Sequence, residues 1–303
     1  MRPDLAGTVL PTTVVGSYPV GEKGKFSLID PLGRAMKNAV ADQVKAGIDI
    51  ISDGQVRGDM VRAFTSHLPG IKGQEVIGQV HPAASQITAG DTRYAISRHR
   101  WVKGIITGPT TLSHALHLST HAYRDREELA TDLAKALVPE ARALEKAGVF
   151  MLQIDEPILS TGAADPVRAG EALALIASSL SVPLCLHICG DLSSVIDAAR
   201  KMPVDVLDFE FARSPENLEI VSDADLGDKM VGYGCVDSAD PVVETEDVIV
   251  ARIERGIDRL GHERMLIDPD CGLRMLTREA AFGKLSHMVR ATRRVRSSLS
   301  DDA

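Results

Sequence analysis

The sequence predicts an α/β fold, and within that class a single (β/α)₈ barrel of the TIM type. Segments rich in β-forming residues alternate with helix-patterned segments almost throughout the 303 residues, which is typical of a parallel sheet covered by helices. Eight such β-rich segments occur, the number that a barrel needs, and chemically reactive residues gather at their carboxyl ends. No linker or low-complexity run divides the chain, so we expect residues 1–303 to form one domain.

The predicted elements follow from the spacing of the apolar residues. The predicted strands are, in order, Thr12–Ser17, Gly47–Asp53, Trp101–Thr107, Val149–Asp155, Val182–Cys189, Val204–Glu210, Met230–Val236 and Met265–Asp268. Helical periodicity predicts helices at Glu127–Ala147, Val167–Leu180, Leu192–Lys201, Thr245–Leu260 and Thr277–Ser297.

An insertion precedes the third predicted strand, over residues 70–97. Apolar or small residues alternate within it at Val76, Gly78, Val80, Ile87 and Ala89. This alternation predicts a hairpin. A doubly wound sheet is the alternative overall fold, but residues 16–19, which follow the first predicted strand, read Gly-Ser-Tyr-Pro and lack the glycine spacing of a dinucleotide site.

Composition limits the classes of partner. The net charge of −8 argues against nucleic acid or an anionic membrane surface as a partner. No apolar stretch approaches the roughly 20 residues that span a bilayer. Four cysteines in a chain of this length are too few for a disulfide scaffold, so we expect reduced thiols and a cytoplasmic protein.

Three short segments each end an apolar run on a residue that can bind a metal. They contribute the candidate ligands His187, Cys189, Glu210 and Cys271. His187 and Cys189 are two residues apart on one predicted strand, so their side chains share a face. Glu210 ends the next strand, and Cys271 follows the last one. One imidazole, two thiolates and one carboxylate make a complete ligand set for zinc.

Simpler interpretations apply to some of these residue types. A buried cysteine is usually a small apolar side chain, and we interpret Cys185 and Cys235 in that way. Glu210 lies between Phe209 and Phe211, where a carboxylate is costly to bury without a cation. This cost favours the metal interpretation for Glu210.

The ligand set also limits the chemistry. Two thiolates and a carboxylate place three negative charges on a dication, which leaves a poor Lewis acid for the activation of water. Such a site can exchange its carboxylate for an incoming thiol and lower the pKa of that thiol. We therefore predict alkyl transfer to a thiol rather than hydrolysis.

Several motifs resemble the catalytic barrel of cobalamin-independent methionine synthase. They occur in the same order over nearly the whole chain, at residues 10–19 (LPTTVVGSYP), 57–61 (RGDMV), 107–109 (TGP), 153–156 (QIDE), 187–189 (HIC) and 268–273 (DPDCGL). Full-length members of the family carry a second, N-terminal barrel, so the resemblance is to a short form with the catalytic barrel alone.

The resemblance implies that the four candidate ligands bind zinc and that homocysteine is the thiol substrate. It places the carboxylate of homocysteine near Val15, Gly16 and Ser17, and the ammonium near Asp155, whose charge suits an amino group. Without the resemblance, Ser17 could equally be a turn hydroxyl and Asp155 a capped strand end.

The evidence for the remaining candidate site residues is less direct. The glutamate that gives the family a second ammonium contact falls near Gly54, and Asp53 is the candidate replacement. Asp155 and Asp237, each at the end of a predicted strand, are the candidate catalytic carboxyl groups.

The departures from the family concern the methyl donor. A glutamate that contacts folate corresponds to Thr161, a histidine thought to protonate the folate nitrogen corresponds to Ala239, and the insertion lacks the tryptophan that faces folate. A methyl group on a folate nitrogen leaves only if that nitrogen is protonated, whereas a methyl group on cobalt needs no proton. These losses predict a methyl-corrinoid donor.

The main hypothesis is therefore methyl transfer from a methyl-corrinoid, either methylcobalamin or a corrinoid protein, to zinc-bound homocysteine, which gives methionine. The first alternative is a methionine synthase that uses 5-methyltetrahydrofolate. The second is methyl transfer to another thiol, such as coenzyme M. The third is a non-catalytic barrel with structural zinc that carries a corrinoid or a thiol. A decarboxylase on a similar barrel is disfavoured because it needs no His-x-Cys with a distant cysteine.

Overall fold

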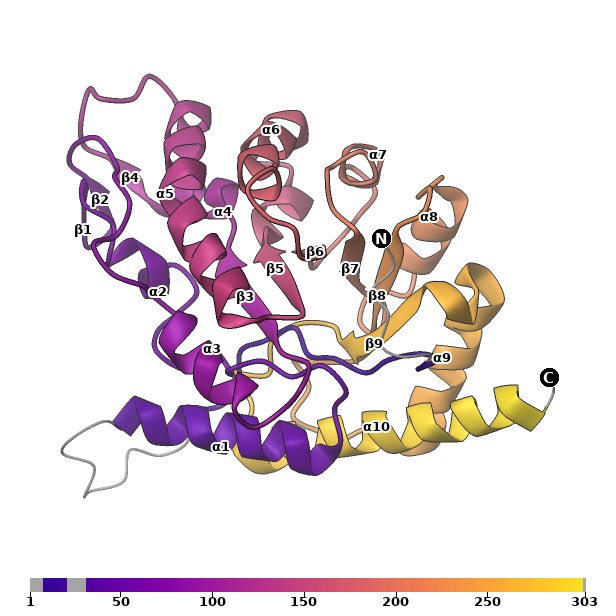
Figure 1. Ribbon diagram of the computed structural model, residues 1–303. Helices are drawn as coiled ribbons and strands as arrows, with labels where there is room; N and C mark the ends of the chain where they lie inside the picture. Colours follow the sequence, from indigo (N-terminus) through magenta and orange to yellow (C-terminus); the bar gives the residue numbers. More distant parts are fainter. Residues whose placement is uncertain (1–7, 21–30, 302–303) are drawn as a thin grey trace.

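A parallel sheet forms the centre of the molecule (Figure 1). The computed structural model describes residues 8–20 and 31–301. Six strands pair in the order β3-β5-β6-β7-β8-β9, and all neighbours are parallel. Their bounds are β3 (Lys103–Thr107), β5 (Met151–Asp155), β6 (Leu184–Ile188), β7 (Val206–Glu210), β8 (Met230–Val236) and β9 (Met265–Pro269). These six strands lie where the apolar pattern predicts them.

The first two predicted strands are reduced to isolated bridges, Thr12 with Ile267 and Ile51 with Val102. Polar side chains take the place of a regular ladder. Asp49 Oδ2 accepts a hydrogen bond from the Thr12 amide at 2.8 Å, and Gln43 Oε1 accepts one from the Ser52 amide at 2.8 Å. Amides that are satisfied by side chains are not available for pairing between strands.

These two segments nevertheless occupy the places of barrel strands. The Thr13 amide donates to the Ile267 carbonyl at 2.8 Å, the Ile50 amide donates to the Thr12 carbonyl at 2.9 Å, and the Lys103 amide donates to the Ile51 carbonyl at 2.7 Å. Backbone hydrogen bonds therefore run from β9 through both segments to β3, in the order that a barrel requires.

Helices alternate with the strands, as the βαβ pattern predicts. Their bounds are α1 (Pro31–Ala46), α2 (Arg62–Thr65), α3 (Ala89–Ile96), α4 (Pro109–Ala115), α5 (Arg126–Ala147), α6 (Pro166–Ala177), α7 (Ile196–Ala199), α8 (Asn217–Asp223), α9 (Glu246–Leu260) and α10 (Arg278–Asp301), with 3₁₀ turns η1 (Pro157–Thr161) and η2 (His262–Arg264). The predictions of α5, α6, α9 and α10 hold within a few residues, whereas α7 is one turn long. The sequence did not predict α1–α4 or α8.

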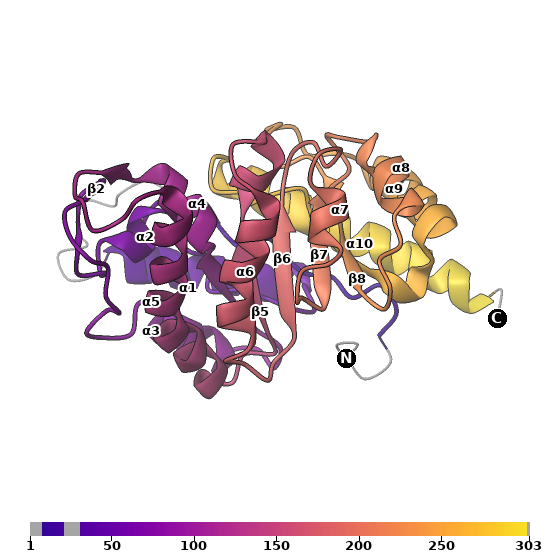
Figure 2. The ribbon, with the colours of Figure 1, turned by 90° about the horizontal axis from the view of Figure 1, so that it is seen from above.

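Side-chain caps explain where three of these helices begin. Asp125, Asp165 and Thr245 accept hydrogen bonds from the first turns of α5, α6 and α9. Figure 1 shows α1 and α10 side by side below the sheet, and Figure 2 shows α6 and α7 alongside β6 and β7. All residues of the six strands are buried, because the barrel interior covers one face and helices cover the other.

The insertion is only partly as predicted. A short hairpin forms from β1 (Ile71–Lys72) and β2 (Glu75–Val76), and β4 (His117–Leu118) pairs with β2. The expectation of a second arm near Ile87 and Ala89 is wrong, because Ala89 begins α3. The carboxylate of Glu140 on α5 accepts hydrogen bonds from the amides of Ile87, Thr88 and Ala89, and so caps α3 from outside the insertion.

Among the residues that the structure describes, no helix is both long enough and apolar enough to cross a bilayer.

Candidate metal centre

Three of the four candidate ligands converge. His187 lies in β6, Cys189 follows this strand directly, and Cys271 lies two residues beyond the end of β9. One ring nitrogen of His187 and the two sulfur atoms all lie within 4.8 Å of one another. An imidazole nitrogen and two sulfurs at this spacing suit a zinc ion, so the donors that the chain presents fit the metal that the sequence predicts.

His187 is 2% exposed and lies above a buried carboxyl group. Its Nδ1 is 3.4 Å from Asp208 Oδ1, and neither ring nitrogen has a hydrogen-bond partner within the described ranges. Burial lowers the pKa of His187, but the negative charge of Asp208 more than offsets it, so the pKa lies well above its ordinary value. Asp208 therefore orients the ring so that Nε2 is available to a metal, a common arrangement in zinc sites.

The two thiols share a hydrogen bond. Contact with Cys271 lowers the pKa of Cys189, whereas contact with Cys189, together with burial, raises the pKa of Cys271. The two thiols are therefore most stable when they hold a single proton between them. A dication bound in place of that proton would leave both cysteines as thiolates. The other cysteines, Cys185 and Cys235, are buried, and burial raises the pKa of each thiol well above its ordinary value.

Glu210 lies outside this group of three. It is the last residue of β7, and its Oε1 accepts a hydrogen bond from Ser214 Oγ at 2.5 Å. The backbone carries Glu210 to the same end of the sheet as the other ligands. Its role as the fourth ligand stays a prediction.

A cavity of about 670 Å³ opens at the three converging ligands. Its wall contains His187, Cys189 and Cys271, and also most of the predicted substrate contacts, namely Val15, Ser17, Asp53 and Asp155. Gly16 lies behind this wall with φ of +152°, and a Cβ there would collide with Ile105. The sequence therefore predicts residues that the fold places around one cavity, although their substrate roles stay predictions.

Asp155 is 6% exposed and is held by Gln153. Nε2 of Gln153 donates to Asp155 Oδ1 at 2.6 Å and to the Val15 carbonyl at 2.7 Å. One amide therefore fixes both predicted contacts of the amino acid, its ammonium site and part of its carboxylate site. Burial raises the pKa of Asp155 to about 6. Gln153 belongs to the motif at residues 153–156, but the sequence analysis assigned it no role; its position two residues before Asp155 on one strand is the signal that places both side chains on the same face.

Asp53 has less freedom to bind a substrate. Its Oδ1 accepts from the Gln55 amide at 2.9 Å, and its Oδ2 accepts from Thr92 Oγ1 at 3.0 Å. Gln55 has a positive φ of 44°, which is strained for a residue other than glycine, and its side chain lies on the cavity wall. Asp53 therefore stabilises the strained turn beside the cavity, whether or not it also contacts substrate.

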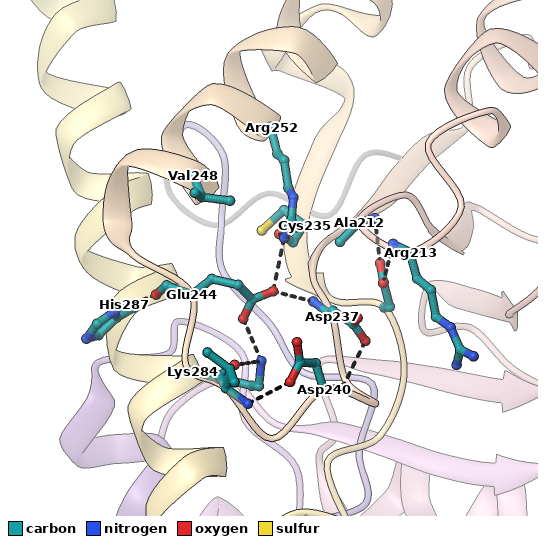
Figure 3. Close-up of polar contacts among 12 residues, drawn as sticks. Ala212, Arg213, Cys235, Asp237, Asp240, Glu244, Val248, Arg252, Lys284 and His287 are labelled. Carbon is teal, nitrogen blue, oxygen red and sulfur yellow. Dashed lines mark hydrogen bonds and ion pairs between the residues drawn. The ribbon is translucent and has the colours of Figure 1, made fainter.

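Asp237 differs from the other predicted residues. It lies just beyond β8, its Oδ1 accepts hydrogen bonds from the amides of Ala239 and Asp240, and it is not part of the cavity wall. Its own amide donates to Glu244 Oε1 at 2.8 Å, as Figure 3 shows. The structure thus uses Asp237 to shape the turn after β8, and its catalytic role stays a prediction.

Comparison with known proteins shows the family. A family model described as the catalytic domain of cobalamin-independent synthase matches residues 10–294. The chain belongs to this family.

Curated relatives and solved structures agree with this membership. The chain is 45% identical to a methionine synthase of Methanothermobacter marburgensis, over 92% of this chain and 98% of the relative. It is 42% identical to a methionine synthase of Methanocaldococcus jannaschii, over 94% and 99%. A B12-independent methionine synthase from a Shewanella species, solved with selenomethionine, superposes with a TM-score of 0.86 at 25% identity over 97% and 100%. The likeness confirms the predicted TIM-type α/β fold.

The family also bears on the predicted methyl donor. The description of the cobalamin-independent synthase family conflicts with the expectation of a methyl-corrinoid as donor and partner, and that expectation is without support. The expectation came from Thr161 and Ala239, two positions at which this chain departs from the family pattern, and from the lack of a tryptophan in the insertion over residues 70–97.

Proposed function

We propose that this protein is a methionine synthase that methylates the thiol of homocysteine at a zinc site formed by His187, Cys189 and Cys271, with Glu210 as a further ligand. The observation that carries the proposal is the convergence of one imidazole nitrogen and two sulfurs within 4.8 Å on the wall of a large cavity. The relatives named methionine synthase support it, as does the selenomethionine in the Shewanella structure, since selenomethionine is an analogue of methionine.

Different residues of the chain have different roles in this proposed reaction. Zinc held by these ligands supplies the positive charge that keeps a substrate thiol ionised near neutral pH. Asp155 faces the same cavity, and as an anion it attracts the ammonium of the amino acid. Val56, Phe64 and Ile87 line another part of the wall, where apolar side chains exclude water from the thiolate and keep it reactive.

The methyl donor that the family description favours is 5-methyltetrahydrofolate. A folate nitrogen must be protonated before it leaves, and Ala239 supplies no proton. On the cavity wall, Asp53 is a carboxyl group away from the metal ligands whose pKa burial raises to about 6. We include the protonated form of this group, which predominates below about pH 6, in the proposal as the proton source for a folate donor.

A donor assay tests the function directly. Purified protein loaded with zinc is given homocysteine and either 5-methyltetrahydrofolate or methylcobalamin, and methionine is measured. We expect methionine from the folate. Methionine formed only from methylcobalamin would refute the folate part of the proposal and leave the zinc-thiol part intact. No methionine from either donor would refute methionine synthesis.

Two other thiols test which methyl acceptor the protein uses. Coenzyme M and 4-mercaptobutyrate, which lacks the amino group of homocysteine, replace homocysteine in the same assay. We expect each to react at least tenfold more slowly, because neither offers an ammonium to Asp155. Equal rates with 4-mercaptobutyrate would show that the role assigned to Asp155 is wrong.

A further inference from the structure

We propose that Asp270 is a positioning residue of the metal centre, whose carboxylate fastens the loop that carries Cys271 to the chain that leaves Glu210. The inference rests on the proposed function, because it assigns a role toward the zinc of that function. Asp270 is not one of the residues that line the cavity, although its neighbour Cys271 is, so its effect is exerted through its neighbours.

The contacts of Asp270 join two of the proposed ligands. Its Oδ1 accepts hydrogen bonds from the amides of Phe211 at 3.0 Å and Ala212 at 2.9 Å, and its Oδ2 accepts one from the Arg213 amide at 2.9 Å. These three amides directly follow Glu210, and Asp270 directly precedes Cys271. One side chain, 1% exposed, therefore connects the exits of β7 and β9, which β8 separates in the sheet.

The sheet leaves room for this connection at Gly234 in β8. A Cβ at this position would lie 2.6 Å from Asp270 Oδ1 and 2.7 Å from the Phe209 carbonyl oxygen. Such distances are below van der Waals contact, so any larger residue would displace the carboxylate from the three amides. The Asp270 amide also donates to the Val236 carbonyl at 2.9 Å, which fixes its backbone to the end of β8.

A second anchor lies on the other side of Cys271. The Leu273 amide donates to the Ser17 carbonyl at 2.8 Å, and a Cβ at Gly272 would collide with Ser17 Oγ. Cys271 therefore lies between two fixed points of the backbone, one on each side.

Cys271 depends on such anchors more than His187 does. His187 pairs within the sheet, with β5 on one side and β7 on the other, so the ladder sets its position. Cys271 lies beyond the end of β9 and has no ladder. Ligands that are held in place before the metal arrives bind it more tightly, and supporting residues are commonly worth about 10- to 100-fold in metal affinity.

The test is the zinc affinity of the full chain, measured by competition with a chromophoric chelator. In Asp270→Asn, the side-chain oxygen can still accept from Phe211 and Ala212, but the amide group opposes the Arg213 N–H. We expect the zinc dissociation constant to rise by about 10- to 100-fold. X-ray absorption of the zinc-loaded variant should show a lower mean number of sulfur ligands than in the wild type.

Asp205→Asn is the matched control. Asp205 Oδ2 accepts a hydrogen bond from the Leu184 amide at 2.9 Å, and so joins β6 and β7 at the opposite end of the sheet. We expect this variant to lose stability toward urea but to bind zinc like the wild type. An Asp270→Asn protein that is less stable but keeps wild-type zinc affinity would show that Asp270 only ties two loops, and would overturn the inference.

The outcomes also separate the inference from the proposed function. A wild-type protein that binds no zinc would refute the function, whatever the variant does. If Asp270→Asn does not fold, Asp270→Glu replaces it, since it keeps both acceptors but displaces them by one methylene. Wild-type zinc affinity in a folded Asp270→Glu protein would likewise overturn the positioning role.

Discussion

Asp53 and Asp155 are carboxyl groups on the cavity wall whose pKa values burial raises to about 6. Their surroundings differ, because two hydrogen bonds occupy Asp53 whereas the Gln153 amide bonds only one oxygen of Asp155. The residue types at these positions could be predicted from the sequence. Their partners could not all be predicted, because Thr92 reaches Asp53 from a segment 39 residues away, and only the folded chain brings these two segments together.

The raised pKa of Asp53 predicts a specific pH dependence of stability. The group loses its proton near pH 3.8 when unfolded and near pH 6 when folded, so the folded state holds more protons between these values. Stability therefore falls as pH rises through this window, by about 3 kcal/mol for a shift of about two units. Above pH 6 the contribution of this group is constant.

Asp53→Asn removes this titration. Urea unfolding of the metal-free protein and of the variant between pH 4 and pH 8 measures the difference. We expect the free energy of unfolding of the wild type, relative to the variant, to fall as pH rises from 4 to 6 and then to level off. A difference that does not change with pH would show that Asp53 titrates normally.

At the scale of elements, the apolar pattern correctly predicts the strands that pair through their backbone. It does not correctly predict the segments whose backbone amides donate to side chains instead. Strands β3 and β5–β9 form as expected, while Asp49 and Gln43 satisfy amides of the first two segments. Glu140 similarly converts a predicted hairpin arm into the start of α3. The carboxylates of Asp49 and Glu140 come from residues far along the chain, and Gln43 comes from the preceding helix, so the apolar pattern of a single segment does not reveal them.

The loop between β8 and α9 is held by a charged cluster (Figure 3). Lys284 of α10 is fully buried, and its ammonium lies 2.5 Å from Glu244 Oε2 and 2.5 Å from the Val242 carbonyl. Arg252 of α9 donates to Glu244 Oε1 at 3.0 Å. The cluster therefore fastens the loop to two helices at once.

Lys284→Met should destabilise the protein by about 2 to 3 kcal/mol, because Glu244 loses one of two cationic partners in a largely buried place. Urea unfolding measures the loss. The double variant Lys284→Met/Glu244→Gln should be more stable than the sum of the single effects by at least about 1 kcal/mol. Strict additivity would mean that the two side chains do not interact appreciably.

At the scale of the whole molecule, the proposed zinc ligands join β6 to the loop after β9. A metal that binds only the folded chain stabilises it, by about 4 kcal/mol at a free concentration a thousandfold above the dissociation constant. For a protein of this size, we expect zinc to raise the melting temperature by roughly 5 to 10 °C. Cys271→Ser should fold but lose most of this increase, as calorimetry with and without a chelator would show. An undiminished increase would remove Cys271 from the ligand set.

The overall architecture was the most predictable level, since eight alternating units leave few other arrangements. The site was predictable as a set of residues at strand ends, because parallel strands bring those ends together. The position of Glu210 beside Ser214 and the turn formed by Asp237 were not, since both depend on side-chain hydrogen bonds rather than on the sheet.

The pairing of residue 12 with residue 267 has a consequence for the newborn chain. A ribosome adds about 5 to 20 residues per second, so the first segment emerges roughly 10 to 50 s before its partner exists. During that interval the Thr13 amide cannot reach the Ile267 carbonyl, its partner in the finished protein. The segment around residue 12 is thus made long before it can complete its pairing, and it is exposed to chaperones and proteases in the meantime.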